Sequence, residues 1–303
     1  MDRRAFLKGS LALPIGLAVS DKVRGLSSIG ISPAPKPDLY VGVWHSGVGG
    51  GTQWSLPATD WDSFAAQDKK YFDQGLRMVT LSSYYDFGQK MSKYTATWRG
   101  GVGTGAQWTI PATDWNAFAA KTQTYFDQGL RLNTISITNK KGQIAYTGTS
   151  RGGLGTGAQW IIPAMEWTAF SAQVGKYLNQ GLRLVSVSTT YNVQEKTVYA
   201  GVCRGDVGGG AQWMIPATDW NSFATQDKKY FDQGLRLVAV STLFMNGQLK
   251  YCGVWRGDQG AGVQWVNAAA DWNTFAAKDK QYFDQGLRLV SLSLARDQSA
   301  AFD

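Results

Sequence analysis

A glutamine followed by a tryptophan recurs five times in this chain, and these ten residues are the best candidates for ligand binding. They are Gln53 and Trp54, Gln107 and Trp108, Gln159 and Trp160, Gln212 and Trp213, and Gln264 and Trp265. Each pair sets an amide beside a large flat ring, a combination that can stack on the face of a sugar and hydrogen-bond its hydroxyls. The alternative is structural, because a tryptophan here can also fill the gap between a loop and the helix that follows it.

Residues that catalysis would need are scarce. The only histidine is His45, and the other copies of the repeat have an arginine at its position: Arg99, Arg151, Arg204 and Arg256. We interpret His45 as a drifted surface position rather than a general base. The two cysteines, Cys203 and Cys252, have neither a metal-binding nor a redox spacing, and we expect two buried free thiols, with a disulfide as the alternative.

Carboxylates recur once per repeat, but their position explains them. They are Asp60, Asp114, Glu166, Asp219 and Asp271, each at the start of an expected helix, where capping and the helix dipole favour an acidic group. A glycosidase pair among them stays open as an alternative, although nothing singles out one copy as active. We therefore predict a protein without catalytic residues, metal or cofactor.

Glycine-rich loops such as residues 101–106 and 153–158 lack the lysine and the spacing of phosphate-binding loops, so we expect flexibility or close packing near a ring centre.

Arg-Gly-Asp occurs at 204–206 and 256–258, where two other copies have Arg-Gly-Gly, and we assign it no function. An arginine also follows each Gln-Gly-Leu string, as in Arg77. We expect its stem to pack within a strand and its charged end to pair with a carboxylate.

The body of the chain is one module written five times. The first tryptophans are 52 to 54 residues apart, and each is followed seven residues later by another (Trp61, Trp115, Trp167, Trp220 and Trp272). Within a module the pattern predicts a strand, a glycine-rich loop, a helix with Thr59 as N-cap in the first copy and Gly75 after its end, and a second strand. A hairpin such as residues 245–248 leads to the next module. We expect modules at 39–92, 93–144, 145–197, 198–249 and 250–303.

The ends of the array suggest how it closes. It opens at Leu39 with a strand that has no hairpin partner before it, and it ends at 287–294 with a strand that has none after it. If these two strands pair, the modules form a closed ring without open sheet edges. The alternative is an open, bent solenoid. The predicted fold class is an α/β repeat protein in either case.

The N-terminal residues have the features of an export signal. Arg3, Arg4, Phe6, Leu7 and Lys8 resemble the twin-arginine motif, and a short apolar stretch follows. We expect a signal peptide at 1–20, a proline-containing linker at 21–38, and a periplasmic or secreted protein that is not inserted in the membrane once the signal is removed. Of the net charge of +8, only +5 lies from Leu39 onward, where basic residues recur once per module and do not cluster, so we expect no nucleic-acid partner.

The repeats resemble bacterial tandem repeat domains, which also form the N-terminal half of fungal polyglycine hydrolases. The resemblance rests on three segments: Trp61 to Phe64, the run Tyr230 to Val238, and the expected strand Tyr251 to Trp255. The resemblance implies an α/β repeat fold but no agreed activity. The chain lacks the β-lactamase-like domain that would bring a Ser-x-x-Lys nucleophile, so the hydrolase activity is not carried over.

Five near-identical copies favour binding over catalysis, because an active site is normally built once. We expect a multivalent, lectin-like protein that recognises a carbohydrate or a cell-wall polymer. A scaffold or inhibitor with a protein partner is the alternative. A peptide or glycan hydrolase is a third and more distant interpretation.

Overall fold

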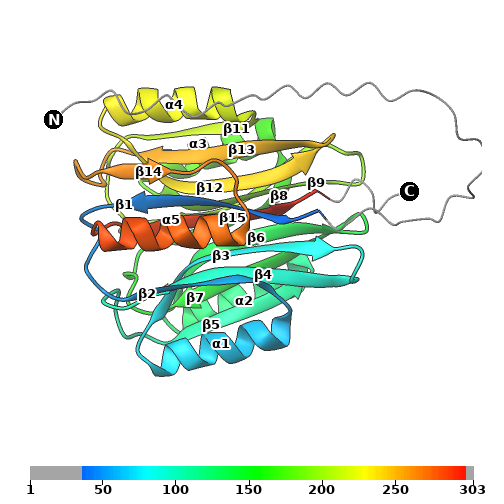
Figure 1. The fold of residues 1–303 in the computed structure, drawn as a ribbon, viewed down its shortest axis with the longest axis horizontal. Helices are drawn as coiled ribbons and strands as arrows, with labels where there is room; N and C mark the ends of the chain where they lie inside the picture. The colour runs from blue at the N-terminus through cyan, green and yellow to red at the C-terminus, as the bar shows by residue number, and fades with distance from the viewer. Residues whose placement is uncertain (1–35, 298–303) are drawn as a thin grey trace, which may run out of the picture. The chain divides into compact units, whose positions relative to one another are not determined.

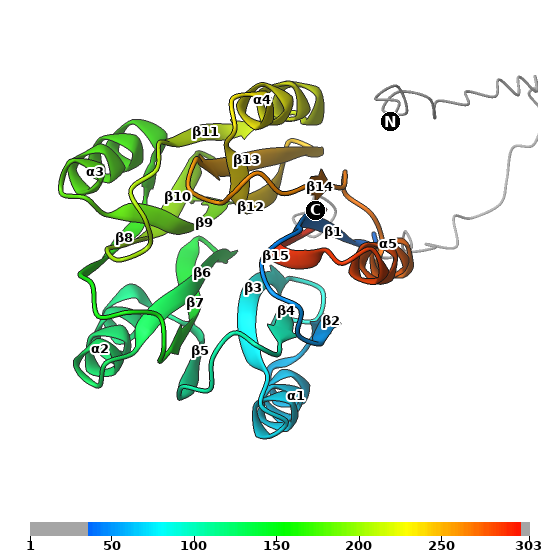
Figure 2. The same ribbon diagram turned by 90° about the vertical axis from the view of Figure 1, so that its left-hand side faces the viewer.

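The computed structural model describes residues 36–297, and these residues form five similar units around a central axis (Figures 1 and 2). We call these units blades. Each blade is a three-stranded antiparallel sheet with one helix packed against one of its faces. Figure 2 shows the sheets grouped around the centre and the helices at the periphery. The α/β repeat fold predicted from the sequence is confirmed.

Each blade contributes one strand of each kind. The inner strands, nearest the axis, are β3 (Arg77–Asp86), β6 (Arg131–Lys140), β9 (Arg183–Tyr191), β12 (Arg236–Met245) and β15 (Arg288–Arg296). The middle strands are β4 (Met91–Arg99), β7 (Gln143–Arg151), β10 (Thr197–Arg204), β13 (Gln248–Arg256) and β1 (Asp38–His45). The outer strands are β2 (Gln53–Thr59), β5 (Gln107–Thr113), β8 (Gln159–Glu166), β11 (Gln212–Thr218) and β14 (Gln264–Val266). The helices are α1 (Trp61–Asp73), α2 (Trp115–Asp127), α3 (Trp167–Asn179), α4 (Trp220–Asp232) and α5 (Trp272–Asp284).

The outer strands correct the predicted unit, which passed from the glycine-rich loop to the helix without a strand. Each outer strand begins at a Gln-Trp pair, and in the first blade it contains Pro57. Proline is tolerated because β2 lies at the sheet edge and its register with β4 shifts between Leu56 and Thr59. A blade therefore joins an outer strand, a helix, an inner strand and a middle strand, so the first blade spans residues 53–99 and not 39–92.

The helix ends follow from local chemistry. Asp60, not the expected Thr59, is the N-cap of α1, because its carboxylate accepts a hydrogen bond from the Ser63 amide at 2.9 Å. The equivalent aspartates cap α2, α4 and α5, whereas Glu166 makes no capping bond and instead pairs with Lys196 at 3.0 Å. Gly75 has a φ of 82° just after α1, as expected for the residue that ends a helix.

The ring closes through the first strand. β1 pairs along its whole length with β15, from Asp38 opposite Arg296 to His45 opposite Arg288, and it also pairs with β14. The chain's first strand thus completes the fifth blade, which confirms the closed ring and shows that the solenoid alternative is wrong. The five sheets remain separate, so the ring is not a continuous barrel.

Serine hydroxyls replace backbone pairing between neighbouring inner strands. The amide of Ser83 donates to Ser136 Oγ of the next blade at 3.0 Å, and the amide of Leu294 donates to Ser82 Oγ at 3.0 Å, which joins the last blade to the first. Similar bonds join the other blades through Ser186, Ser188, Ser241, Ser291 and Ser293. These bonds satisfy sheet-edge amides that would otherwise lie buried without partners.

The hydrophobic core is divided into five clusters, and four of them contain buried residues of two neighbouring blades. Phe118 and Leu132 of the second blade, for example, pack with Val198 and Val202 of the third. Burying one such large apolar side chain contributes ~1.5–3 kcal/mol, so each blade depends on its neighbour for a large part of its stability. Cys203 and Cys252 lie buried in one cluster as free thiols, which confirms the expectation from the sequence.

Glycines allow neighbouring loops to approach closely at the end of the ring where the middle strands finish. A Cβ on Gly51 would lie 2.0 Å from the carbonyl oxygen of Gly100. The same approach recurs between Gly105 and Gly152, where a Cβ would lie 2.6 Å from the carbonyl carbon. Close packing, one of the two explanations offered for these glycines, is therefore confirmed.

The predicted signal peptide lies outside the described residues, as does the linker up to residue 35. Among residues 36–297, no helix is both long enough and apolar enough to cross a membrane.

Candidate functional site

The tryptophans of the Gln-Trp pairs form a row of platforms around the outside of the ring. Trp54, Trp108 and Trp213 are each 54% exposed, and Trp160 is 52% exposed. Trp265, in the shortest outer strand, is only partly exposed. Exposure of a large aromatic side chain at the same place in four blades is unusual, because burying it would be favourable.

Each platform is held flat by a tyrosine of the helix beneath it. Trp108 stacks on Tyr125 with ring centroids 6.1 Å apart and an interplanar angle of 11°. The other pairs are Trp54 with Tyr71, Trp160 with Tyr177, Trp213 with Tyr230, and Trp265 with Tyr282. Because the tyrosine covers one face of the indole, the ring has a fixed orientation and its opposite face is available for stacking.

The glutamines of the pairs are engaged within the protein. The Gln107 carbonyl oxygen accepts a hydrogen bond from the Met78 amide at 2.7 Å, and its amide nitrogen donates to Asp68 at 2.8 Å. The other four make corresponding contacts: Gln53 with Leu289 and Asp279, Gln159 with Leu132, Gln212 with Leu184, and Gln264 with Leu237 and Asp227. The structure thus uses the carbonyl oxygen of each glutamine to join its blade to the preceding one, and the amide nitrogens of four of them donate within the protein as well. A role for these amides as partners of sugar hydroxyls stays a prediction.

A groove accompanies one platform. Trp160 and Gln159 line it on one side, and Trp115 and Phe126 of the preceding blade line it on the other. Its volume is 370 Å³, within the range of small-molecule sites. The platform at Trp160 therefore lies beside a cavity that two blades build together.

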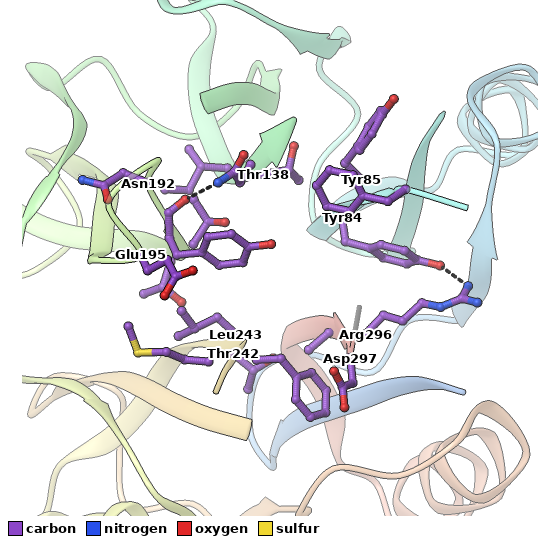
Figure 3. Close-up of a pocket in the computed structure, with 18 of the residues that line it drawn as sticks. Tyr84, Tyr85, Thr138, Asn192, Glu195, Thr242, Leu243, Arg296 and Asp297 are labelled. Atoms are coloured by element: carbon purple, nitrogen blue, oxygen red, sulfur yellow. Dashed lines mark hydrogen bonds between the residues drawn. The ribbon is translucent and has the colours of Figure 1, made fainter. Parts of the chain in front are cut away.

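A larger pocket, which sequence reasoning missed, opens on the axis at the hairpin end of the ring (Figure 3). It has a volume of 520 Å³ and is lined by residues from all five blades. Tyr84 and Tyr85 lie on one wall, with Arg296 next to Tyr84 and Asn192 across the pocket. One signal for this pocket was present in the sequence, since the last residues of the inner strands differ in all five copies.

Polar bonds order one wall of this axial pocket. Tyr84 donates its hydroxyl proton to Asp38 at 2.8 Å, and Arg296 donates to both Tyr84 Oη and Asp86 at 3.0 Å. Burial raises the pKa of Asp38 above its ordinary value, although the bond from Tyr84 and the charge of Arg296 act in the opposite direction. The Thr138 hydroxyl is buried without a hydrogen-bond partner. The internal bonds hold Tyr84 and Arg296 in fixed positions at the pocket.

His45 and the four arginines at its position are buried, which corrects their interpretation as surface residues. His45 is 3% exposed, and Arg99, Arg151, Arg204 and Arg256 are 5–6% exposed. Burial, together with the positive charges of Arg236 and Arg99, lowers the pKa of His45 to about 4. The imidazole is therefore neutral at pH 7.

The arginine that follows each Gln-Gly-Leu string also differs from expectation. Arg77 donates to the carbonyl oxygens of Gly105 and Thr104 at 2.6 and 2.7 Å, and it stacks on Phe72. Its charged end thus binds the next glycine-rich loop rather than a carboxylate. A structural role was expected, and the contacts support it with a different partner.

Among the described residues, no group of histidine, cysteine, aspartate or glutamate side chains has an arrangement that could hold a metal ion. The carboxylates at the helix starts lie on separate blades, where four of them cap helices.

Comparison with known protein families decides what the blades are. A family model described as "Polyglycine hydrolase-like, structural repeat" matches residues 59–99, 164–203 and 218–257. Three of the five blades match the polyglycine hydrolase-like structural repeat. Each match begins two or three residues before a helix and ends within one residue of the end of a middle strand, so the family repeat coincides with most of a blade. A comparison with curated proteins finds no match for the chain.

Proposed function

We propose that this protein is a multivalent, non-catalytic binding protein that recognises a carbohydrate or cell-wall polymer through its outer tryptophans. The observation that carries the proposal is the exposure of Trp54, Trp108, Trp160 and Trp213, each stacked on a tyrosine. A pre-oriented indole loses little conformational freedom when a sugar ring stacks on it. Several weak sites on one rigid ring gain avidity for a polymer that presents the same sugar repeatedly.

Export by the twin-arginine route would bring the protein to such a polymer. A periplasmic or secreted location is part of this proposal and rests on Arg3 and Arg4, which lie outside the described residues. We also propose that the protein catalyses no reaction, binds no nucleic acid and is not inserted in the membrane after the signal is removed.

The test compares a platform tryptophan with a structural tryptophan of the same blade. Trp54→Ala removes an exposed ring and should cost about 1–2 kcal/mol of stability, while Trp61→Ala removes a ring packed against Phe64 and Tyr94 and should cost ~3–5 kcal/mol. A glycan array on the protein selects the oligosaccharide, with the β-1,4-linked N-acetylglucosamine tetramer as the first probe, and its binding is then measured by titration calorimetry. Trp54→Ala should lower the number of bound oligosaccharides per chain by one.

The axial pocket favours a second candidate, a scaffold or inhibitor with one protein partner. Its lining residues differ between blades at most positions, so it offers one asymmetric site per chain. Binding of one protein per chain, sensitive to Tyr85→Ala and insensitive to Trp54→Ala, would support this candidate over the first.

A further inference from the structure

Gln159 differs from the other glutamines of the Gln-Trp pairs, because its amide nitrogen has no acceptor among the described residues. Its carbonyl oxygen accepts a hydrogen bond from the Leu132 amide at 2.6 Å. A backbone N–H can only donate, so this bond fixes which end of the side-chain amide faces Leu132. The amide nitrogen, with two N–H donors, is left over and is not closed off from solvent. Gln159 therefore has donors that the fold does not use.

The equivalent glutamines at the other four junctions between blades all donate within the protein. At three junctions the acceptor is an aspartate of the preceding helix, at 2.7–2.8 Å: Gln53 with Asp279, Gln107 with Asp68, and Gln264 with Asp227. At the fourth, Gln212 donates to the carbonyl oxygen of Leu184 at 2.9 Å. The junction between the second and third blades, where Gln159 lies, therefore stands apart.

Two sequence differences explain this junction. The helix of the second blade carries Thr122 at the position of Asp68, so the carboxylate is replaced by a hydroxyl. That hydroxyl is directed at backbone carbonyl oxygens of its own helix, at 2.9 and 3.0 Å, and not at Gln159. The outer strand of the third blade carries Ile161 where Thr109 donates to Asp68. The polar network of the first junction is thus absent from this one.

The groove of 370 Å³ lies at this same junction. Trp115, Phe126 and Ile161 give it apolar walls, and Gln159 and Trp160 line it as well. The tyrosine on which Trp160 stacks is not part of the lining, so the groove and the supporting ring contact different parts of the indole. An unused amide donor therefore lies in a largely apolar groove, next to an indole of fixed orientation.

This combination selects for a particular ligand group. An amide donor between apolar walls favours a group that joins an acceptor oxygen to apolar surface. The acetamido group of an N-acetylated sugar has both, a carbonyl oxygen and a methyl group. A hydroxyl in its place would bring its own donor into a groove whose apolar walls offer it no acceptor, and an unpaired buried donor is unfavourable.

We propose that the groove beside Trp160 binds the acetamido group of an N-acetylated hexosamine, with Gln159 Nε2 donating to its carbonyl oxygen and the sugar ring lying against Trp160. This inference rests on the proposed function, since it assigns a sugar class to one of the tryptophan platforms. The amides beside the other four platforms already donate within the protein. Those platforms therefore bind sugars without this preference.

Two disaccharides with the same β-1,4 linkage test the preference. The N-acetylglucosamine dimer carries acetamido groups, and the glucose dimer carries hydroxyls at the same positions. Both are titrated calorimetrically into the full chain at pH 7. The wild type should have one site per chain that binds the N-acetylglucosamine dimer about tenfold more tightly than the glucose dimer, as expected for one well-placed hydrogen bond.

Gln159→Glu removes the donor and keeps the contact to the neighbouring blade, because a carboxylate oxygen still accepts from the Leu132 amide. This variant should lose the tenfold preference. The matched control is Gln123→Glu, which adds the same charge to the same groove on a residue whose amide already donates to Asp127 at 2.8 Å. The control should keep the preference, and thermal melts should show that both variants are folded.

A second pair of variants supplies or withholds the missing acceptor. Thr122→Asp places a carboxylate where Asp68 accepts from Gln107, so it should engage Gln159 internally and abolish the preference. Thr122→Val introduces the residue that Val174 provides at this position of the third blade and should retain the preference. This pair keeps the proposal testable if Gln159→Glu does not fold.

The proposal is overturned if the wild type binds neither dimer or shows no preference between them. Unchanged preference in Gln159→Glu, or equal loss in Gln123→Glu, also overturns it. Trp54→Ala separates this inference from the proposed function. If Trp54→Ala still removes one bound tetramer while Gln159→Glu changes nothing, only the inference fails. If the dimer binds once, at a site sensitive to Gln159→Glu, and Trp54→Ala has no effect, the inference holds and the multivalent function fails.

Discussion

Replacing Asp68 by alanine should loosen the junction between the first two blades. The Asp68 carboxylate accepts hydrogen bonds from Trp98 Nε1 at 2.6 Å, from Gln107 Nε2 at 2.8 Å and from Thr109 Oγ1 at 3.1 Å. Trp98 is fully buried, so its indole N–H would lose its partner without gaining water. Hydrogen bonds to charged groups contribute about 1.5–3 kcal/mol each and do not add, so we expect a total loss of about 3 kcal/mol.

The internal repeats support this reasoning. Asp68, Asp227 and Asp279 accept from Trp98, Trp255 and Trp44, respectively. In the second and third blades the helix carries Thr122 and Val174, and the strand carries Ser150 and Cys203 at the tryptophan position. The aspartate is thus present where the indole N–H is present, and absent where it is absent.

The assay is urea denaturation of Asp68→Ala, Trp98→Phe and the double variant. Because Trp98→Phe removes the N–H but keeps an aromatic ring, Asp68→Ala should cost about 1 kcal/mol less in that background. Asp73→Ala on the same helix is the control, since its exposed pair with Lys69 should contribute under about 0.5 kcal/mol. Strict additivity of the two changes, or equal costs for Asp68→Ala and the control, would refute the reasoning.

Three further predictions concern pH, closure and export. Burial lowers the pKa of His45 from its ordinary value near 6.5 to about 4 in the folded state, so the unfolded chain binds the proton first as the pH falls. The free energy of unfolding should therefore fall by about 3 kcal/mol as the pH drops from 6.5 to 4. His45→Gln should flatten this dependence in thermal melts, and an unchanged profile would contradict the prediction. Deleting residues 39–44 removes most of β1, so hydrogen exchange should accelerate at 287–294 in the distant fifth blade, whereas unchanged protection there would argue against the closed ring. Replacing Arg3 and Arg4 by lysine should leave the precursor in the cytoplasm, as fractionation would show, and undiminished export would reject the twin-arginine signal.

Much of the fold could be predicted because each module carries strong local signals. The helix faces and the glycine after each helix predicted the module. The unpaired strands at both ends of the array predicted the closed ring. The outer strands were missed because Pro57 argues against a strand, and the edge position of β2 together with the register shift beside the proline makes it acceptable. The sequence pattern does not contain that shift.

The candidate sites were harder to predict because they depend on contacts between blades. Arg99 looks like a surface residue at a strand end, and it is buried by the loop containing Val48, about 50 residues away in the chain. Gln107 looks available to a ligand, but the preceding blade occupies its amide. The axial pocket combines the ends of five strands, so its lining exists only after the ring has closed.

The most direct test of the central claim is the number of oligosaccharides bound per chain at saturation. Titration calorimetry with the N-acetylglucosamine tetramer, or with the sugar that the array selects, gives this number for the wild type and for a variant with alanine at Trp54, Trp108, Trp160 and Trp213. The account predicts four or five weak sites in the wild type and at most one in the variant, because Trp265 is the least exposed of the five. A single site per chain that survives the four substitutions, or no oligosaccharide binding at all, would contradict the account.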